Sequence, residues 1–211
     1  AIKEVAPEVK VGVVLNLVDL RFVGQLTPEL QGEMDLIDSY TNLWWLEGML
    51  EGKYPKNLLA TFEALTGIRV DEKEIGDVSY GRDWLGLNYY AGQVLTGGGS
   101  GIELFPGTKS ITNTLWGTER TDIGWNWTPD GLRKLLIRLN QIFPQLPIYI
   151  TENGACYNDG PDSSGKVDDI KRQEYMALYI QSAVDSIKDG VNLKGYYAWS
   201  LLDNFEWAFG F

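Results

Sequence analysis

The sequence predicts an α/β fold built around a parallel sheet, and two observations lead to this prediction. Along the 211 residues, apolar strand-like runs alternate with segments whose apolar residues recur at helical spacing, a pattern typical of strands joined by right-handed helical crossovers. Polar and aromatic residues also gather at the carboxyl ends of the predicted strands, the edge that carries the active site in parallel barrels. An open doubly wound sheet and half of a (β/α)8 barrel both fit this pattern.

The first half of the chain contains the clearest buried strand. Lys10–Leu17 is a near-continuous run of β-branched and aliphatic residues, as expected for a strand covered on both faces. Two helical patterns follow, and Gly67 lies just past the end of the second. The elements predicted here are, in order, strand 10–17, helices 36–50 and 55–65, strand 83–90 and a flexible loop that opens at 97–101.

The second half begins with a strong helix start at Thr128-Pro129-Asp130. It combines an N-cap residue, a proline in the first turn and an acid near the positive end of the helix dipole. The elements predicted after this helix are strand 147–151, helix 168–189 and strand 195–201. The long helix carries one apolar face, formed by Met176, Ile180, Ala183, Val184 and Ile187.

The composition excludes several classes of function. The formal net charge of −11 gives an acidic surface that repels phosphate backbones, so we expect no nucleic-acid partner. The chain has no run of 18 apolar residues, which predicts no membrane partner, and its first residues do not resemble a signal peptide. A single cysteine, Cys156, excludes an internal disulfide. We therefore expect a cytoplasmic protein.

The absence of histidine limits the chemistry further. It removes Ser-His-Asp and Cys-His catalysis and most zinc or haem ligation within this chain, so we expect no cofactor and no metal. Acid–base work must come from carboxylates, lysine or tyrosine. The chain is also rich in aromatic residues, with 8 Trp and 11 Tyr. Most aromatics pack in cores, but those beside carboxylates offer faces on which a sugar ring can stack.

Two acids follow predicted strands and are the candidate catalytic groups. Glu152 comes where strand 147–151 emerges into a turn, and Glu206 follows the last strand. Either acid alone is more commonly an ordinary turn residue. Together they lie at the same end of adjacent parallel strands, near the amide and aromatic residues Asn88, Tyr90, Trp125, Trp199 and Trp207. A carboxylate with stacking surfaces and amide donors is what sugar hydrolysis requires.

Two long segments narrow the functional interpretation of these residues. Pro147–Gly154 and Gly195–Trp207 resemble the two C-terminal signatures of glycoside hydrolase family 1, the β-glucosidase family. Trp84–Tyr90, Val11–Leu17 and Ile123–Trp125 are also similar to segments of that family. The resemblance implies a (β/α)8 TIM barrel of which this chain is about the second half, strands five to eight. It implies one domain over residues 1–211 that lacks the N-terminal half and the final helix.

The resemblance also implies a role for each candidate residue. Glu152 corresponds to the catalytic nucleophile, which Tyr90 orients by a hydrogen bond, and Asn88 lies near the sugar 2-hydroxyl. Glu206 corresponds to the acid that binds the 4- and 6-hydroxyls, and Trp207 to the indole that donates to the 3-hydroxyl. Trp199 corresponds to the platform under the sugar ring and Trp125 to the wall on the leaving-group side. Glucose, galactose and fucose all remain open as the sugar.

The chain departs from the family pattern in one chemically important way. The family's acid/base glutamate lies in an Asn-Glu-Pro motif, and none occurs here. Retaining hydrolysis needs two carboxylates about 5 to 5.5 Å apart. We therefore expect a retaining β-glycosidase whose second glutamate comes from a segment absent from this chain, with a complementary N-terminal half or self-association as partner. Leu43 and Tyr179 also differ from the family's usual arginine and histidine.

Two other hypotheses stay open at this point. The chain could be a non-catalytic carbohydrate-binding or scaffold fragment of the same barrel, which keeps the aromatic surface without turnover. It could also be a doubly wound α/β protein with another ligand. That third reading predicts a nucleotide or phosphate site, and neither glycine-rich nucleotide fingerprint is present.

Overall fold

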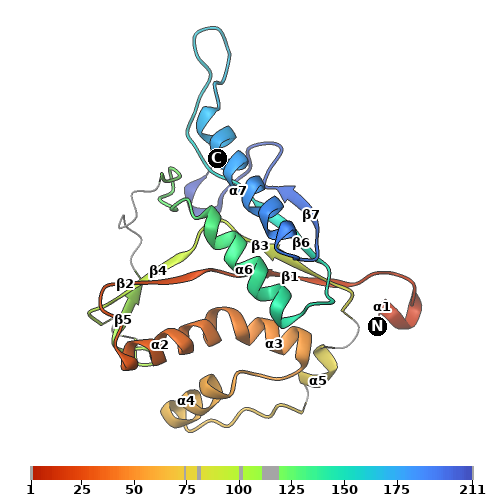
Figure 1. Ribbon diagram of the computed structural model, residues 1–211, viewed down its shortest axis with the longest axis vertical. Helices are drawn as coiled ribbons and strands as arrows, with labels where there is room; N and C mark the ends of the chain where they lie inside the picture. Colours follow the sequence, from red (N-terminus) through yellow and green to blue (C-terminus); the bar gives the residue numbers. More distant parts are fainter. Residues whose placement is uncertain (1, 74, 80–81, 100–101, 111–118, 211) are drawn as a thin grey trace. The chain divides into compact units, whose positions relative to one another are not determined.

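The computed structural model describes residues 2–73, 75–79, 82–99, 102–110 and 119–210 (Figure 1). The chain divides into two compact units. Unit 1 comprises Ala1–Gly86 and Gln93–Ile111, and unit 2 comprises Leu87–Gly92 and Thr112–Phe211. All the candidate site residues belong to unit 2, so the site is described within that unit. Whether the chain forms one domain stays a prediction.

Unit 1 combines short strands with helices. Its strands β2 and β4 are parallel, with Leu20 opposite Gln93, and β4 pairs antiparallel with β5. Strand β1 neighbours β3, which passes from unit 1 into unit 2. The strands are β1 (Gly12–Asn16), β2 (Leu20–Val23), β3 (Trp84–Asn88), β4 (Gln93–Gly97) and β5 (Thr108–Ser110). The helices are α1 (Ile2–Val5), α2 (Pro28–Asp38), a π-helical turn (Ser39–Leu43), α3 (Trp44–Glu51), α4 (Lys56–Thr66) and α5 (Ile75–Val78).

The predictions for unit 1 hold for the strongly apolar strands and less well elsewhere. Strands β1 and β3 fall within the predicted ranges. The helix predicted to begin at residue 36 begins at Pro28, because Thr27 caps it by accepting a hydrogen bond from the Leu30 N–H at 3.3 Å. The loop predicted to open at 97–101 starts where strand β4 ends, and residues 100–101 lie outside the described residues.

Unit 2 is built around the end of β3 and two further parallel strands. Strand β6 (Ile148–Asn153) lies between β3 and β7 (Leu193–Ala198) in the sheet order. Strands β6 and β7 are parallel, with Ile148 opposite Leu193 and Asn153 opposite Ala198. Two helices complete the unit, α6 (Pro129–Ile142) and α7 (Ile170–Lys188), together with a short 3-10 turn at Trp207–Phe209. Each predicted strand and helix of this half is therefore present.

Helix α7 buries a different face from the apolar face that the sequence predicts. Its buried residues are Tyr175, Tyr179, Ala183 and Ser186. Of the predicted apolar face only Ala183 is buried, whereas Ile180, Val184 and Ile187 are exposed. Helix α6 buries a stripe of four leucines: Leu132, Leu135, Leu136 and Leu139. Within the described ranges, no helix is long and apolar enough to cross a bilayer.

Candidate active site

Glu152 lies near the carboxyl end of β6, where the strand leaves the core of unit 2. The two isoleucines that precede it, Ile148 and Ile150, are fully buried and fix the strand's alternation. The Glu152 carbonyl accepts a hydrogen bond from the Tyr89 N–H at 3.0 Å, which anchors its backbone to the segment after β3. Its side chain is partly exposed and therefore accessible to a ligand.

Tyr90 holds the Glu152 carboxylate directly. The Tyr90 hydroxyl donates to Oε2 of Glu152 at 2.6 Å, a short distance typical of a charge-assisted hydrogen bond. Burial, followed by this hydrogen bond and by the charges of Glu152 and Glu206, raises the pKa of Tyr90. The phenol therefore stays protonated at neutral pH and keeps its proton to donate. The charge of Glu206 is the smallest of these contributions.

Asn88 and Trp125 approach the same pair from two sides. The Thr151 hydroxyl, beside Glu152 in the chain, donates to Oδ1 of Asn88 at 2.7 Å, which leaves the Asn88 amide nitrogen as the group that can donate. The ring of Trp125 lies 5.2 Å from that of Tyr90 at 52°, and its indole is 40% exposed. An accessible indole therefore adjoins the carboxylate-binding tyrosine, as stacking on a sugar would require.

The three candidates after β7 are more open. The Trp199 N–H donates to the Asn153 carbonyl at 2.9 Å, which ties this segment to β6, and its indole is 46% exposed. Glu206 is partly buried and accepts a hydrogen bond from the Asn204 amide at 3.1 Å. The indole of Trp207 is 82% exposed, so the structure does not bring it into the packed cluster of Tyr90, Trp125 and Glu152.

Asn153 is a residue of the site to which the sequence assigned no role. Its amide is fully buried, and its nitrogen donates to the Tyr89 carbonyl at 2.6 Å and to the Tyr175 hydroxyl at 3.1 Å. Its oxygen accepts from the Tyr196 hydroxyl. A buried amide with all these bonds fixes the end of β6 next to Glu152. Its position directly after the candidate nucleophile was the signal that could have found it.

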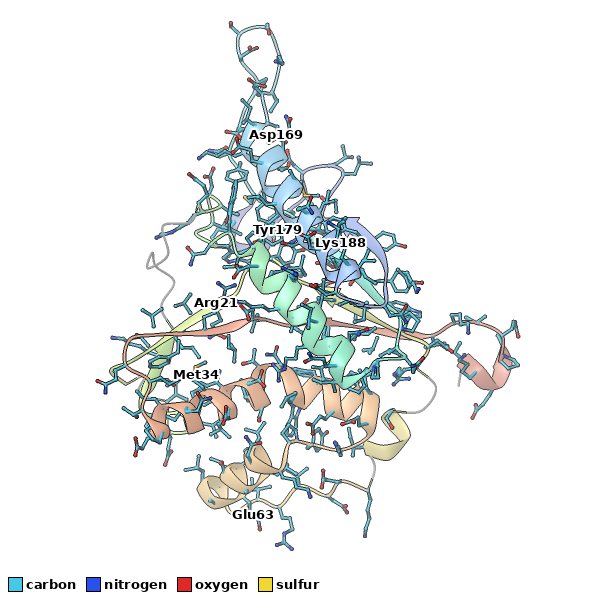
Figure 2. The ribbon with its side chains drawn as sticks, viewed as in Figure 1. Arg21, Met34, Glu63, Asp169, Tyr179 and Lys188 are labelled. Atoms are coloured by element: carbon cyan, nitrogen blue, oxygen red, sulfur yellow. The ribbon has the colours of Figure 1, made fainter. Side chains whose placement is uncertain are left out.

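Tyr175 and Tyr179 were also missed as parts of the site. Both lie on the buried face of α7, and both hydroxyls donate to the Tyr90 carbonyl at 3.0 Å. Figure 2 places Tyr179 on α7 between the ends marked by Asp169 and Lys188. The sequence noted Tyr179 only as a departure from the family pattern. Two tyrosines one helical turn apart on a helix face were the available signal.

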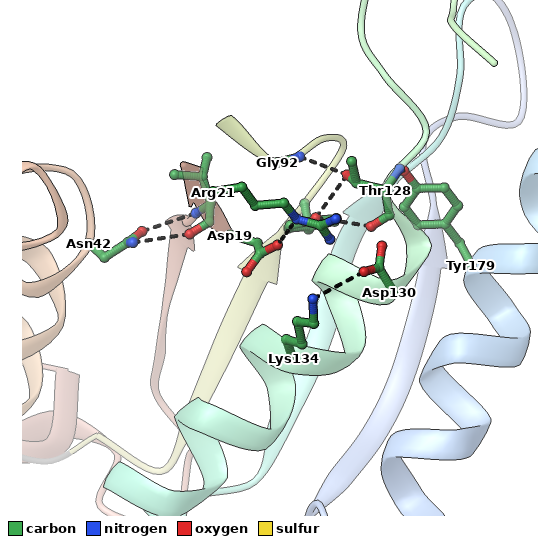
Figure 3. A network of polar contacts seen from close by, with 10 residues as sticks. Asp19, Arg21, Asn42, Gly92, Thr128, Asp130, Lys134 and Tyr179 are labelled. Atoms are coloured by element: carbon green, nitrogen blue, oxygen red, sulfur yellow. Dashed lines mark hydrogen bonds and ion pairs between the residues drawn. The ribbon is translucent and has the colours of Figure 1, made fainter. Parts of the chain in front are cut away.

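Thr128 differs from the helix cap that the sequence predicts. Its side chain makes no capping hydrogen bond to α6. Instead its Oγ1 accepts from the Gly92 N–H at 2.7 Å, and its own N–H donates to the Tyr179 hydroxyl at 2.7 Å (Figure 3). The Thr128 hydroxyl thus accepts the backbone N–H of Gly92, which lies two residues after Tyr90. The start of α6 is therefore attached to the site by this residue.

Comparison with known proteins gives a consistent result. A profile of Glycosyl hydrolase family 1 matches residues 1–211. β-Glucosidase A of Acetivibrio thermocellus is 35% identical over 211 residues, which cover 99% of this chain and 46% of that protein. The β-glucosidase of an Agrobacterium species is 36% identical over 217 residues, covering 100% of this chain and 45% of that protein. The chain thus spans just under half the length of these relatives.

Solved structures agree with the sequence relatives. The structure of the AHE enzyme from Alicyclobacillus herbarius has a TM-score of 0.87 and 31% identity, and the match covers 99% of this chain and 45% of that one. A GH1 β-glucosidase from Exiguobacterium antarcticum has a TM-score of 0.87 and 32% identity, with coverages of 99% and 46%. These likenesses confirm the predicted fold class, a portion of an α/β barrel.

Proposed function

Because the chain belongs to glycosyl hydrolase family 1, we propose that it is part of a retaining β-glycosidase in which Glu152 is the nucleophile. The observation that carries this proposal is the 2.6 Å hydrogen bond from Tyr90 to Oε2 of Glu152 at the end of β6. A nucleophile must be held in one orientation toward the reacting carbon, and a single strong donor on one oxygen leaves the other for attack.

The reaction that fits this arrangement has two steps. A Glu152 oxygen attacks the anomeric carbon, the bond from that carbon to the leaving-group oxygen breaks, and an acid/base glutamate gives its proton to that oxygen. The same glutamate then takes a proton from water, which attacks the anomeric carbon and releases Glu152. Two inversions at one carbon give net retention. Tyr90 contributes by keeping its proton and holding the carboxylate.

We propose for the remaining candidates the sugar-binding roles that the family resemblance implies. We assign Asn88 to the 2-hydroxyl, Glu206 and Trp207 to the other ring hydroxyls, Trp199 to the face of the ring and Trp125 to the leaving group. Support comes from the exposed tryptophans and from the Asn88 amide nitrogen, which is left to donate because Oδ1 accepts from Thr151. A β-glucosidase from Thermotoga maritima, solved in complex with deoxynojirimycin, is 26% identical to this chain and favours a β-glucoside as substrate.

The acid/base glutamate and the proposed partner are considered together, because the partner would supply that residue. We assign the acid/base glutamate to a complementary N-terminal half, because the chain covers only 46% of the Acetivibrio relative. Unit 2 also carries a run of exposed apolar side chains that suits a covering partner: Tyr197, Trp199, Leu201, Leu202, Phe205, Trp207 and Phe209. Strand β7 lies at the edge of the sheet order, which offers backbone groups for pairing. Self-association is the alternative means of covering this surface.

The nucleophile can be tested without the second carboxylate. A 2,4-dinitrophenyl 2-deoxy-2-fluoro-β-glucoside has a leaving group that departs without a proton, and the fluorine slows hydrolysis of the glycosyl-enzyme. We expect one label per chain, which peptide mapping places on Glu152. Glu152→Gln should abolish labelling. Glu174→Gln, which changes an exposed glutamate on α7, is the matched control and should label at the wild-type rate. A label on another residue would overturn the assignment.

The missing acid predicts a second outcome. The chain alone should hydrolyse an unactivated aryl β-glucoside very slowly, because we assign the glutamate that protonates the leaving oxygen to the complementary half. Addition of the N-terminal half of the Acetivibrio β-glucosidase should increase this rate by at least about a hundredfold, the usual contribution of general acid catalysis. Hydrolysis by the isolated chain at a normal enzymatic rate would show that the acid lies within it.

A carbohydrate-binding function without turnover is the second candidate. The observation in its favour is that the indoles of Trp125, Trp199 and Trp207 are 40%, 46% and 82% exposed, as in a stacking surface. Glu152→Gln separates the two functions. If both forms bind a β-glucoside equally and neither form is labelled or turns substrate over in the assembled barrel, the binding function is correct.

A further inference from the structure

We propose that Tyr175 and Tyr179 are positioning residues, which keep the Tyr90 phenol on Glu152 by fixing the Tyr90 backbone. The inference rests on the function proposed above and adds to it two residues that never touch the sugar. Both lie one turn apart on α7, with side chains that are 1% and 0% exposed. Their rings stack with centroids 4.0 Å apart at 19°, so each restricts the orientation of the other.

The two hydroxyls meet at one atom. Tyr175 and Tyr179 each donate to the carbonyl oxygen of Tyr90 at 3.0 Å, which occupies both lone pairs of that oxygen. Burial raises the pKa of both phenols, so neither loses the proton that it donates. Removal of either hydroxyl leaves this buried carbonyl with one donor fewer and therefore changes how the Tyr90 peptide is held.

Each hydroxyl also accepts a hydrogen bond, and the two acceptors differ. Tyr175 accepts from the Asn153 amide at 3.1 Å, and Asn153 directly follows Glu152. Tyr179 accepts from the Thr128 N–H at 2.7 Å at the start of α6. The residue that donates to the nucleophile and the residue next to the nucleophile are therefore joined through the single hydroxyl of Tyr175. This connection distinguishes Tyr175 from an ordinary core tyrosine.

The geometry explains why the backbone matters to the chemistry. The Tyr90 phenol oxygen is at the far end of its side chain, so a small rotation of the Tyr90 peptide moves that oxygen by a larger distance. The bond to Glu152 is 2.6 Å long, and short charge-assisted bonds weaken when lengthened or bent. Two donors on the Tyr90 carbonyl limit this rotation. Tyr175 and Tyr179 thus act on the nucleophile through Tyr90.

The test compares three tyrosines that differ in what their hydroxyls bind. Tyr175→Phe and Tyr179→Phe should each lower the rate constant for labelling by the fluoroglucoside at least tenfold at saturation, with the half-saturating concentration unchanged within twofold. Tyr157→Phe is the matched control, because Tyr157 is also buried but its hydroxyl accepts from the Trp127 indole at 2.7 Å. It should label within twofold of the wild-type rate.

A second arm separates positioning from general loss of structure. In a Tyr90→Phe background the phenol is gone, so Tyr175→Phe and Tyr179→Phe should lower the labelling rate no further. A purely structural role predicts that the losses multiply, and that result would overturn the proposal. Circular-dichroism melting checks that each single variant folds. We expect both to fold, because in each variant the remaining tyrosine hydroxyl still donates to the Tyr90 carbonyl. If neither variant folds, the hydroxyls are structural and the proposal is wrong.

The outcomes distinguish this inference from the proposed function. If the wild-type chain, alone and combined with the Acetivibrio N-terminal half, is not labelled on Glu152, the proposed function fails and the inference with it. If the wild type is labelled on Glu152 but both α7 variants label at the same rate, only the inference fails.

Discussion

Among single residues, Tyr90 has the most direct link to the candidate nucleophile. The substitution Tyr90→Phe removes the hydrogen bond from the Tyr90 hydroxyl to the Glu152 carboxylate. A hydrogen bond to a charged group contributes about 1.5–3 kcal/mol, so we expect the labelling rate constant to fall by about 10- to 150-fold. The measurement is the time course of covalent labelling. Tyr40→Phe, which changes an exposed tyrosine of the π-helical turn in unit 1, is the control and should leave the rate unchanged.

Several residues of the candidate site were selected from the sequence, whereas the contacts that hold them were not. Glu152, Tyr90 and Trp125 were selected by motif, and the structure places them in one cluster. Asn153, Tyr175 and Thr128 were not selected, because their roles depend on contacts between elements far apart in the chain. Trp207 was selected with the others, yet it is 82% exposed. A motif names residue types, whereas burial depends on what covers them.

At the scale of elements, the close approach of β6 and the segment after β7 is the most constrained contact. A Cβ added at Gly154 would overlap the Trp199 carbonyl oxygen, which is backbone and cannot move aside. We therefore expect Gly154→Ala to lower the free energy of unfolding by about 3 kcal/mol or more, at the upper end for overpacking. Urea unfolding measures this change.

A second glycine serves as the control for that prediction. Gly160 lies in the loop after β6, and a Cβ added there meets no atom within 4 Å. Gly160→Ala should leave the free energy of unfolding unchanged or raise it by up to about 1 kcal/mol, because it restricts the unfolded chain. Equal midpoints for both variants would contradict the overlap at Gly154.

Elements were predicted from the sequence where apolar residues dominate them. Strands β3 and β6 have several buried aliphatic residues and were found. Strand β1 was also found, but it is not covered on both faces as predicted, because only Leu15 of its five residues is buried and Val14 is exposed. Strand β2 is only four residues long and half-buried throughout, so it leaves no clear alternation to detect. The buried face of α7 was missed for a different reason. It consists of tyrosine, alanine and serine, and a search for aliphatic periodicity favours the exposed isoleucines and valine instead.

For the whole molecule, buried tyrosines predict how stability depends on alkaline pH. Burial is the main cause that raises the pKa of Tyr157 to about 12, and it also raises the pKa of Tyr90, Tyr175, Tyr179 and Tyr196. The folded state therefore keeps protons that the unfolded state releases near pH 10. Stability from these groups is fully present below pH 10 and is lost as pH rises from there through the folded-state pKa values.

This prediction can be measured in one titration. Each such tyrosine lowers the free energy of unfolding by up to about 1.4 kcal/mol per pH unit above its unfolded pKa. We expect tyrosinate absorbance and far-UV circular dichroism to change together, because these phenols ionise as the chain unfolds. Full tyrosine ionisation with the helical signal retained would show that the phenols are not held in the core.

The exposed apolar residues of helix α7 affect how this chain behaves during expression. Its inward face carries Tyr175 and Tyr179, and its outward face exposes Ile180, Val184 and Ile187. Polar replacements on the outward face should reduce aggregation during expression, since scattered charge opposes nonspecific association. These three side chains lie on the opposite face of the helix from the tyrosines that hold the Tyr90 carbonyl. They are therefore the first positions to change when soluble yield must be raised and the Tyr90–Glu152 bond kept.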